Sequence, residues 1–256
     1  GILNYYDKKS PHLGLPKDLA TTKLKANRPL PQGEKRFLYR IKHPMDSSPQ
    51  KLQRLRKELS ASGLDGCLLP VTDEYQGEYS ADYARRVTWL TGFDGSAGMA
   101  VILQNKAALL VDGRYTIQAA QETDRALYET HNSGSMKPED YLIQHLGNKK
   151  DTVIGYDPWL HTHAQIERLE KALTSSTITL KAVAKNPVDS ILPKPIPRPM
   201  EPVIPHPLEY AGQPHQEKRQ DIAKIIKEKH ASALLITEPD AICWLLNIRG
   251  RDIPFN

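Results

Sequence analysis

The chain has 256 residues, of which 39% are hydrophobic and 25% are charged, a composition typical of a soluble globular protein. It contains no apolar run close to the ~18 residues that a membrane-spanning helix needs, so no membrane partner is expected. The net charge of +5 comes from the start of the chain, because residues 1–50 hold ten Lys or Arg and four Asp or Glu, whereas residues 51–256 hold 25 and 26. Those basic residues are scattered without interleaved aromatic residues, which argues against a nucleic-acid partner.

Residues 1–47 contain five prolines and no lasting hydrophobic period. Such a segment lacks the apolar surface that would compensate for the entropy of ordering it. We therefore expect residues 1–47 to form an extended arm or a disordered leader.

Regular structure is expected to begin at Ser48, which can cap a helix whose first position is Pro49. Leucines then follow at helical spacing until Gly63 ends the helix. The further elements expected in this part of the chain are strand 66–71, helix 82–90, strands 99–104 and 106–111, helices 115–122 and 138–145, strand 153–156, helix 162–173 and strand 177–183. Alternating strands and helices with one tight hairpin predict an α/β domain over residues 48–186, with a mixed β-sheet flanked by helices.

A proline-rich stretch follows, with nine prolines between residues 186 and 214. Proline removes a backbone donor and clashes with the preceding helical turn. We therefore expect residues 187–214 to be a stiff interdomain linker without a helix.

Residues 215–256 repeat the opening of the first domain. Helix 216–230, strand 233–237 and the Trp244-Leu245-Leu246-Asn247 turn correspond to helix 49–63, strand 66–71 and Trp89-Leu90-Thr91-Gly92. The second copy stops after one strand, and one strand cannot form a sheet. It is therefore predicted to be the incomplete start of a second, similar domain that borrows strand partners or stays loosely held.

The densest cluster of glycines lies in Leu90-Thr91-Gly92-Phe93-Asp94-Gly95-Ser96-Ala97-Gly98 and continues in Asp112-Gly113-Arg114-Tyr115. So many glycines indicate positive φ angles or close approach of backbone segments. The predicted hairpin between the two clusters ends at a strand terminus that presents Arg114. A guanidinium fixed in this way can hold a carbonyl or carboxylate group through paired hydrogen bonds. The alternative is a structural salt bridge from Arg114 to Asp112 or Asp94.

Other candidate sites have ordinary structural alternatives. Asp94 and Asp112 could act as an acid–base pair, but Asp-Gly is common turn chemistry. The glycine loop lacks both the Gly-Lys-Ser/Thr of a phosphate cradle and the glycine spacing of a dinucleotide site. His161 and His163 could bind a metal, but no further ligand stands at a convincing spacing, and histidines are common at helix starts.

The end of the chain and the cysteines are less informative. Arg249 and Arg251 flank Gly250 and either bind a ligand or serve turn packing, with an ion pair to Asp252. Cys67 and Cys243 lie in apolar segments and are expected to be reduced, buried thiols, which favours a reducing, cytoplasmic compartment.

Three motifs in order, WLTGFDGSAG, VDGRYTIQAA and DAICWLLNIRGRDIPFN, resemble the N-terminal region of the three-domain Xaa-Pro aminopeptidases of the creatinase superfamily. The resemblance runs from about residue 50 to Asn256, and Arg251 departs from the small residue that usually follows the glycine. It implies a creatinase N-terminal-like fold, followed by the linker and the start of a second such domain.

The same resemblance implies a homodimeric enzyme that removes the N-terminal residue from peptides with proline second. Two manganese ions would be bound by a C-terminal domain that begins after Asn256. This chain would then hold no catalytic residue and no metal ligand, would be inactive alone, and would contribute Arg114 to binding the substrate peptide. The alternative is a catalytically inactive creatinase-like protein-interaction module, which also occurs among relatives.

Overall fold

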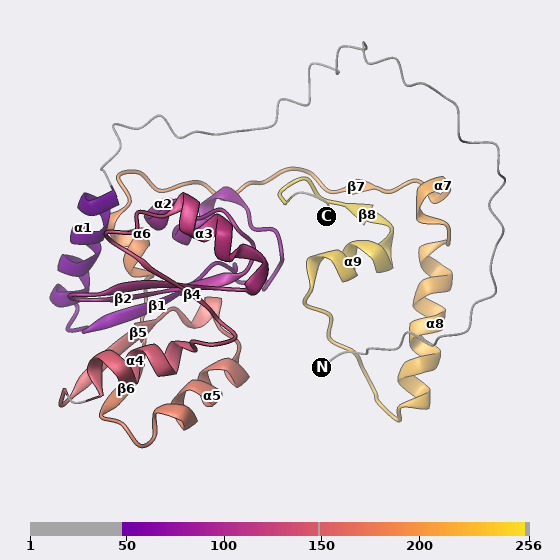
Figure 1. The fold of residues 1–256 in the computed structure, drawn as a ribbon. Coiled ribbons are helices and arrows are strands. Elements are labelled where there is room, and N and C mark those ends of the chain that lie inside the picture. The colour runs from indigo at the N-terminus through magenta and orange to yellow at the C-terminus, as the bar shows by residue number, and fades with distance from the viewer. Residues whose placement is uncertain (1–47, 148, 254–256) are drawn as a thin grey trace, which may run out of the picture. The chain divides into compact units, whose positions relative to one another are not determined.

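The computed structural model describes residues 48–147 and 149–253, so the predicted arm of residues 1–47 lies outside the described residues. Figure 1 shows a layered α/β body followed by a proline-rich strap and a helical segment. The helices are α1 (Ser48–Ala61), α2 (Arg86–Thr91), α3 (Thr116–Glu122), α4 (Pro138–Leu146), α5 (His163–Leu173), α6 (Pro187–Ile191), α7 (Leu208–Ala211), α8 (His215–Glu228) and α9 (Pro239–Leu246). The strands are β1 (Gly66–Pro70), β2 (Gly98–Leu103), β3 (Ala107–Val111), β4 (Glu129–Asn132), β5 (Thr152–Tyr156), β6 (Ile178–Ala182), β7 (Ile204–Pro205) and β8 (Ile248–Arg249).

The body is built on one mixed sheet with the strand order β4-β3-β2-β1-β5-β6. Strand β2 is antiparallel to both of its neighbours, whereas β3 and β4, β1 and β5, and β5 and β6 pair in parallel. The carboxyl ends of every strand except β2 therefore meet at one edge of the sheet. The predicted mixed α/β fold and its hairpin are confirmed, and strand β4 is an element that the sequence reasoning missed.

Helices cover both faces of this sheet (Figure 1). Side chains of α1, α2, α3 and α6 pack on one face in one hydrophobic cluster, and side chains of α4 and α5 pack on the other face in a second cluster. Alternate residues of β1 divide between them, since Cys67 and Leu69 face the first cluster and Leu68 faces the second. Because β1 is buried on both faces, its sequence is apolar without a period of two, as is typical of strands covered by helices on both sides.

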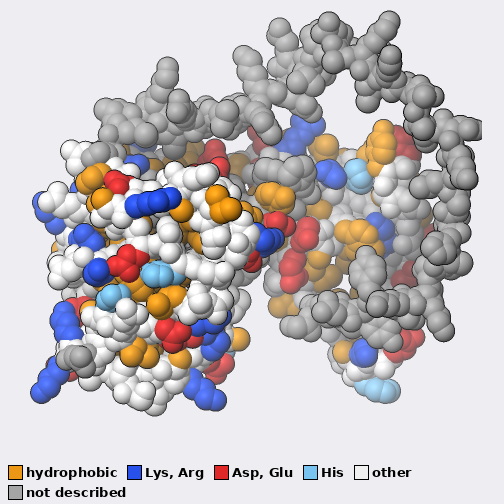
Figure 2. Space-filling model, in the orientation of Figure 1, with side chains coloured by type: hydrophobic (Ala, Val, Ile, Leu, Met, Phe, Trp, Pro, Cys, Tyr) orange, Lys and Arg blue, Asp and Glu red, His pale blue; other side chains and the backbone are white. Residues whose placement is uncertain are grey.

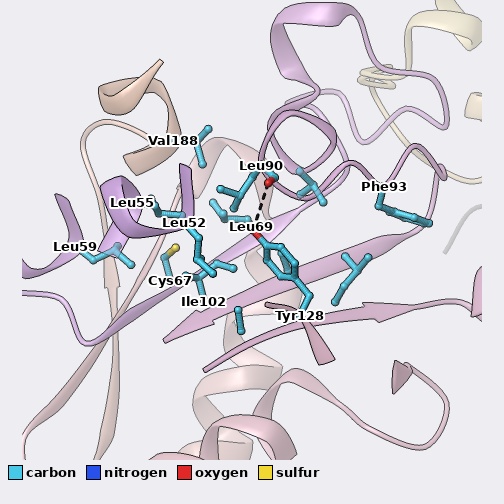
Figure 3. Packing of buried hydrophobic residues seen from close by; sticks show 14 of the residues in the cluster. Leu52, Leu55, Leu59, Cys67, Leu69, Leu90, Phe93, Ile102, Tyr128 and Val188 are labelled. Carbon is cyan, nitrogen blue, oxygen red and sulfur yellow. Dashed lines mark hydrogen bonds between the residues drawn. The ribbon is translucent and has the colours of Figure 1, made fainter. Parts of the chain in front are cut away.

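Tyr128, which directly precedes β4, is a buried member of the first cluster. Its hydroxyl donates a hydrogen bond of 3.3 Å to the backbone carbonyl of Leu90 in α2 (Figure 3). Leu52, Leu55 and Leu59 of α1 lie in the same cluster at the helical spacing that the sequence shows. The predicted first helix is confirmed to within two residues at its end.

The prediction that residues 187–214 contain no helix is wrong. Pro187 occupies the first position of α6, where its missing N–H costs nothing, and Asn186 caps the helix by accepting from the Val188 amide. Val188 and Ile191 are buried in the first cluster, so the packed body extends past residue 186. The short helix α7 likewise fits between two prolines of the strap.

The predicted helix over residues 82–90 is a 3₁₀ turn, Asp82–Ala84, followed by α2. In the second copy, α8 forms as predicted, and α9 is a helix that the sequence reasoning did not name. The predicted strand over residues 233–237 is wrong, since those residues have no regular structure. A strand needs a partner strand, and no strand among the described residues pairs with this segment.

Nothing in residues 48–147 and 149–253 forms a helix long and apolar enough to cross a lipid bilayer.

Candidate functional site at the carboxyl edge of the sheet

Arg114 lies at the carboxyl edge of the sheet, in a 3₁₀ turn (Gly113–Tyr115) directly after β3. Its Nε donates to Oδ1 of Asp112 at 2.9 Å, and its Nη2 lies 3.3 Å from Oδ2. Asp112 also caps the turn by accepting from the Arg114 amide at 2.8 Å. The salt bridge and the turn cap that the sequence offered as structural alternatives are therefore both present at Asp112.

The ion pair favours the charged form of both Asp112 and Arg114. Hydrogen bonding to Arg114 lowers the pKa of the Asp112 carboxyl, and Asp112 in turn raises the pKa of the guanidinium. The side chain of Arg114 is 68% exposed, and the pair uses two of the five N–H donors of an arginine. Asp112 thus engages one side of the Arg114 guanidinium, which still has donors for a ligand.

The glycine motif explains how the turn is held. A Cβ atom at Gly95 would lie 2.3 Å from Cζ of Phe93 and 2.8 Å from Cδ1 of Tyr115, so only glycine lets the backbone pack against both rings. These two rings meet edge to face with centroids 5.8 Å apart. The turn that carries Arg114 is therefore anchored to the glycine loop through Tyr115.

Beside this anchor lies a half-open cavity of about 320 Å³, lined by the loop after β1, the start of α2, the glycine loop, Tyr115 and Gln118 of α3. Its polar lining includes Arg85, which is paired with Asp94, and Ser96, whose hydroxyl lies 2.8 Å from that of Tyr115. Asp94 is thus the partner of Arg85, not of Arg114. The Asp94 and Asp112 carboxylates each hold an arginine, which leaves neither as an obvious general base.

The two histidines do not form a metal site. His161 is buried, with its Nδ1 2.9 Å from the carbonyl oxygen of Asp157, and burial lowers the pKa of its imidazole. His163 is exposed, 3.5 Å from Glu167 in the next turn of α5. Across the described ranges, no group of three or more His, Cys, Asp or Glu side chains is placed to hold a metal ion.

The arginines near the end of the chain have modest structural surroundings. Arg249 lies in β8, which pairs with β7. Asp252 accepts a hydrogen bond of 2.7 Å from the Glu201 amide in the strap, and no role for Arg251 follows from its surroundings.

Sequence reasoning missed the contribution of the loop after β1. Glu78 and Tyr79 line the cavity, and Glu74 pairs with Arg198 of the strap at 2.7 Å while accepting from the Tyr83 hydroxyl at 2.8 Å. The segment is polar and carries no motif, so only its placement beside the glycine loop reveals it. On the face shown in Figure 2, acidic and basic side chains of the body are interspersed rather than gathered into one block.

Curated proteins similar to this chain include the probable Xaa-Pro aminopeptidase P of Ajellomyces dermatitidis, which is 36% identical over 216 residues. The probable Xaa-Pro aminopeptidase P of Coccidioides posadasii (strain C735) is 37% identical over 216 residues. The matches cover 83% of this chain and 34% and 33% of those proteins, so the chain spans about a third of the length of the curated relatives.

A solved structure supports the same kinship. The X-prolyl aminopeptidase of Caenorhabditis elegans, described as a cytosolic enzyme with a di-nuclear active site, matches with a TM-score of 0.73 and 32% identity over 82% of this chain and 36% of that one. The family described as the creatinase/prolidase N-terminal domain matches residues 51–186, and a second family with the same description matches residues 193–256. The chain therefore belongs to the creatinase/prolidase N-terminal domain family, with two successive matches to such domains.

Proposed function

We propose that this chain is the non-catalytic N-terminal portion of a metal-dependent Xaa-Pro aminopeptidase, a hydrolase that removes the N-terminal residue from peptides with proline second. The observation that carries the proposal is the similarity over 83% of the chain to proteins named Xaa-Pro aminopeptidase P. The described residues supply no metal site, so two metal ions, manganese in our proposal, would be bound by polypeptide outside them. The description of the C. elegans relative as a di-nuclear, cytosolic enzyme supports a two-metal site and a cytoplasmic location.

In this proposal the chain shapes the substrate site and supports a homodimer. Arg114 orients the peptide, because its fixed guanidinium can donate paired hydrogen bonds to a peptide carbonyl or carboxylate. Asp112 positions Arg114 through their ion pair. A nucleic-acid or membrane partner is not part of the proposal.

The first test compares this 256-residue chain with the full-length protein in an Xaa-Pro peptide assay with manganese. We expect turnover by the full-length protein and only background from the chain alone. Turnover by the chain alone would contradict the proposal. Absence of turnover in the metal-loaded full-length protein would favour the alternative, a catalytically inactive protein-interaction module.

The second test concerns Arg114 in the full-length protein. Losing a hydrogen bond to a charged group costs about 1.5–3 kcal/mol, so Arg114→Ala should lower kcat/KM by about 10- to 100-fold. Lys106→Ala is the matched control, because Lys106 also forms an ion pair, with Glu129 at 2.9 Å, but it lies at the hairpin end of β3, away from Arg114. Equal activity of the two variants would remove Arg114 from the substrate site.

A further inference from the structure

The cavity beside Tyr115 has a surplus of negative charge. Glu78 and Asp94 line it together with one cation, Arg85, which is already paired with Asp94. Two more carboxylates adjoin this group, since Asp82 lies 4.0 Å from Arg85 and Glu122 accepts from the Asp94 amide at 2.9 Å. The lining therefore holds two carboxylates and one guanidinium, and the adjoining Arg114 is itself paired with Asp112.

Two tyrosine rings, Tyr79 and Tyr115, complete the lining, and tyrosine faces attract cations. The ring of Tyr115 already carries one cation, because the guanidinium carbon of Arg114 lies 5.4 Å from its centroid. Hydroxyl groups of Thr88, Ser80 and Ser96 add acceptors for N–H donors. Carboxylates, aromatic rings and hydroxyls are the groups that recognise an ammonium or guanidinium.

The size of the cavity suits one long side chain. Its volume of about 320 Å³ lies at the lower end of the ~300–1,000 Å³ typical of ligand pockets. Val71 and Val87 supply an apolar wall for the methylene stem of such a side chain.

The cavity adjoins Arg114. Tyr115 is both the next residue in the turn and part of the cavity wall, and Glu78 of the cavity adds to the effect of Asp112 in raising the pKa of Arg114. A peptide bound at Arg114 would therefore lie next to the cavity, because Tyr115 belongs to both.

We propose that this cavity receives a basic side chain, lysine or arginine, of the peptide substrate. The inference rests on the proposed function, because it takes the ligand to be a peptide bound at Arg114. Binding of a basic side chain in this cavity makes the enzyme selective for peptides that carry a positive charge near the cleaved bond. If the cavity instead binds an acidic side chain through Arg85, the proposal is wrong.

The experiment is an NMR titration of the ¹⁵N-labelled chain with three blocked peptides, acetyl-Ala-Pro-Lys-amide, acetyl-Ala-Pro-norleucine-amide and acetyl-Ala-Pro-Glu-amide. Blocking both ends leaves the third side chain as the only difference in charge. We expect the lysine peptide to bind at least about fivefold more tightly than the norleucine peptide, to shift the amides of Ser96 and Tyr115, and to weaken as salt is added. Equal binding of all three peptides, tighter binding of the glutamate peptide, shifts elsewhere, or no binding would each overturn the proposal.

Glu78→Gln should remove most of the preference for lysine, because it deletes the cavity carboxylate that forms no direct ion pair with a described residue. Glu170→Gln is the matched control, since Glu170 is an exposed residue of α5, which packs on the opposite face of the sheet. Loss of the preference in both variants, or in neither, would contradict the assignment to the cavity.

The binding result and the activity result can fail separately. If the full-length protein shows no Xaa-Pro turnover while the lysine preference persists, the proposed enzymatic function fails and the cation-binding cavity stands. If turnover is normal but the three peptides bind equally, the enzymatic function stands and the cavity assignment fails.

Discussion

Lys51 and Lys218 make the same two contacts in the two copies of the repeated segment. Each Nζ donates at 2.9 Å to the backbone carbonyl of a tryptophan, Trp89 for Lys51 and Trp244 for Lys218. Each also lies over the ring of that tryptophan, 4.8 and 4.6 Å from the centroid. In both copies the lysine stands near the start of a long helix and the tryptophan stands in the last turn of a short one, where backbone carbonyls lack helical partners.

The lysine contacts should carry measurable stability. Lys51→Met keeps the aliphatic stem but leaves the Trp89 carbonyl without this donor, so the free energy of unfolding should fall by about 1–3 kcal/mol. Urea denaturation followed by tryptophan fluorescence and circular dichroism measures the change. Lys57→Met, at an exposed position of the same helix, is the control and should be nearly neutral.

Lys218→Met should act only locally. Lys218 also donates to Oδ1 of Asn247 at 2.7 Å, so hydrogen exchange of the α8 and α9 amides should accelerate, while exchange in β1 and β2 stays unchanged. Acceleration throughout the sheet would contradict the local role.

Leu68 and Leu235 are equivalent in the repeat but differ in burial, since Leu68 is 0% exposed and Leu235 is 85% exposed. Leu68→Ala should therefore lower the free energy of unfolding by about 2–5 kcal/mol. Leu235→Ala should change it by no more than about 0.5 kcal/mol. Urea denaturation of both variants checks the pair, and similar losses would mean that residues 233–237 are packed.

Tyr128 and Tyr141 are both buried tyrosines, but only Tyr128 has a partner for its hydroxyl among the described residues. Tyr128→Phe breaks the bond to the Leu90 carbonyl and should cost about 1 kcal/mol. Tyr141→Phe removes a buried hydroxyl that has no partner among the described residues, so it should be neutral or stabilising. Thermal unfolding of both variants tests the difference, and a larger loss for Tyr141→Phe would be the contrary result.

His161 makes stability depend on pH. Burial lowers the pKa of its imidazole in the folded state, so below about pH 6.5 the unfolded chain binds a proton more readily than the folded one. The titration of His161 therefore leaves the free energy of unfolding unchanged above pH 6.5. Below that pH it lowers the free energy of unfolding, with a slope of at most about 1.4 kcal/mol per pH unit.

Urea denaturation between pH 5 and 7.5 measures the slope for the parent chain and two variants. In His161→Asn the slope should flatten, because no group titrates at that position. In His163→Asn the slope should stay as in the parent, because the His163 side chain is 88% exposed. A steep slope in both variants would assign the effect to other groups.

Most of the element order could be predicted from local patterns. The helix at Ser48 has a cap, a first-position proline and leucines at helical spacing, and these signals are contained in the segment itself. Strand β4 was missed because its sequence, Glu-Thr-His-Asn, is polar and becomes a strand only by pairing with β3 at the sheet edge. The strand predicted over residues 233–237 has an apolar composition suited to a strand, but no described strand pairs with it, whereas its counterpart β1 has two neighbours.

The candidate site could likewise be predicted from the sequence only in part. The glycine motif and Arg114 could be found from the sequence, because glycine density and an arginine after a strand are local signals. The pairing of Arg85 with Asp94 and the contribution of Glu78 could not, because they depend on how the loop after β1 folds against the glycine loop.

The sequence by itself determined the α/β class, the hairpin, the repeated segment and the position of Arg114, because each follows from spacing and residue type over a few consecutive positions. Only the tertiary structure decided which carboxylate holds which arginine, that α6 completes the first hydrophobic cluster, and that residues 233–237 remain without strand structure. Those outcomes depend on contacts between residues far apart in the chain, and a side chain or strand is stabilised only by the partners that actually pack against it.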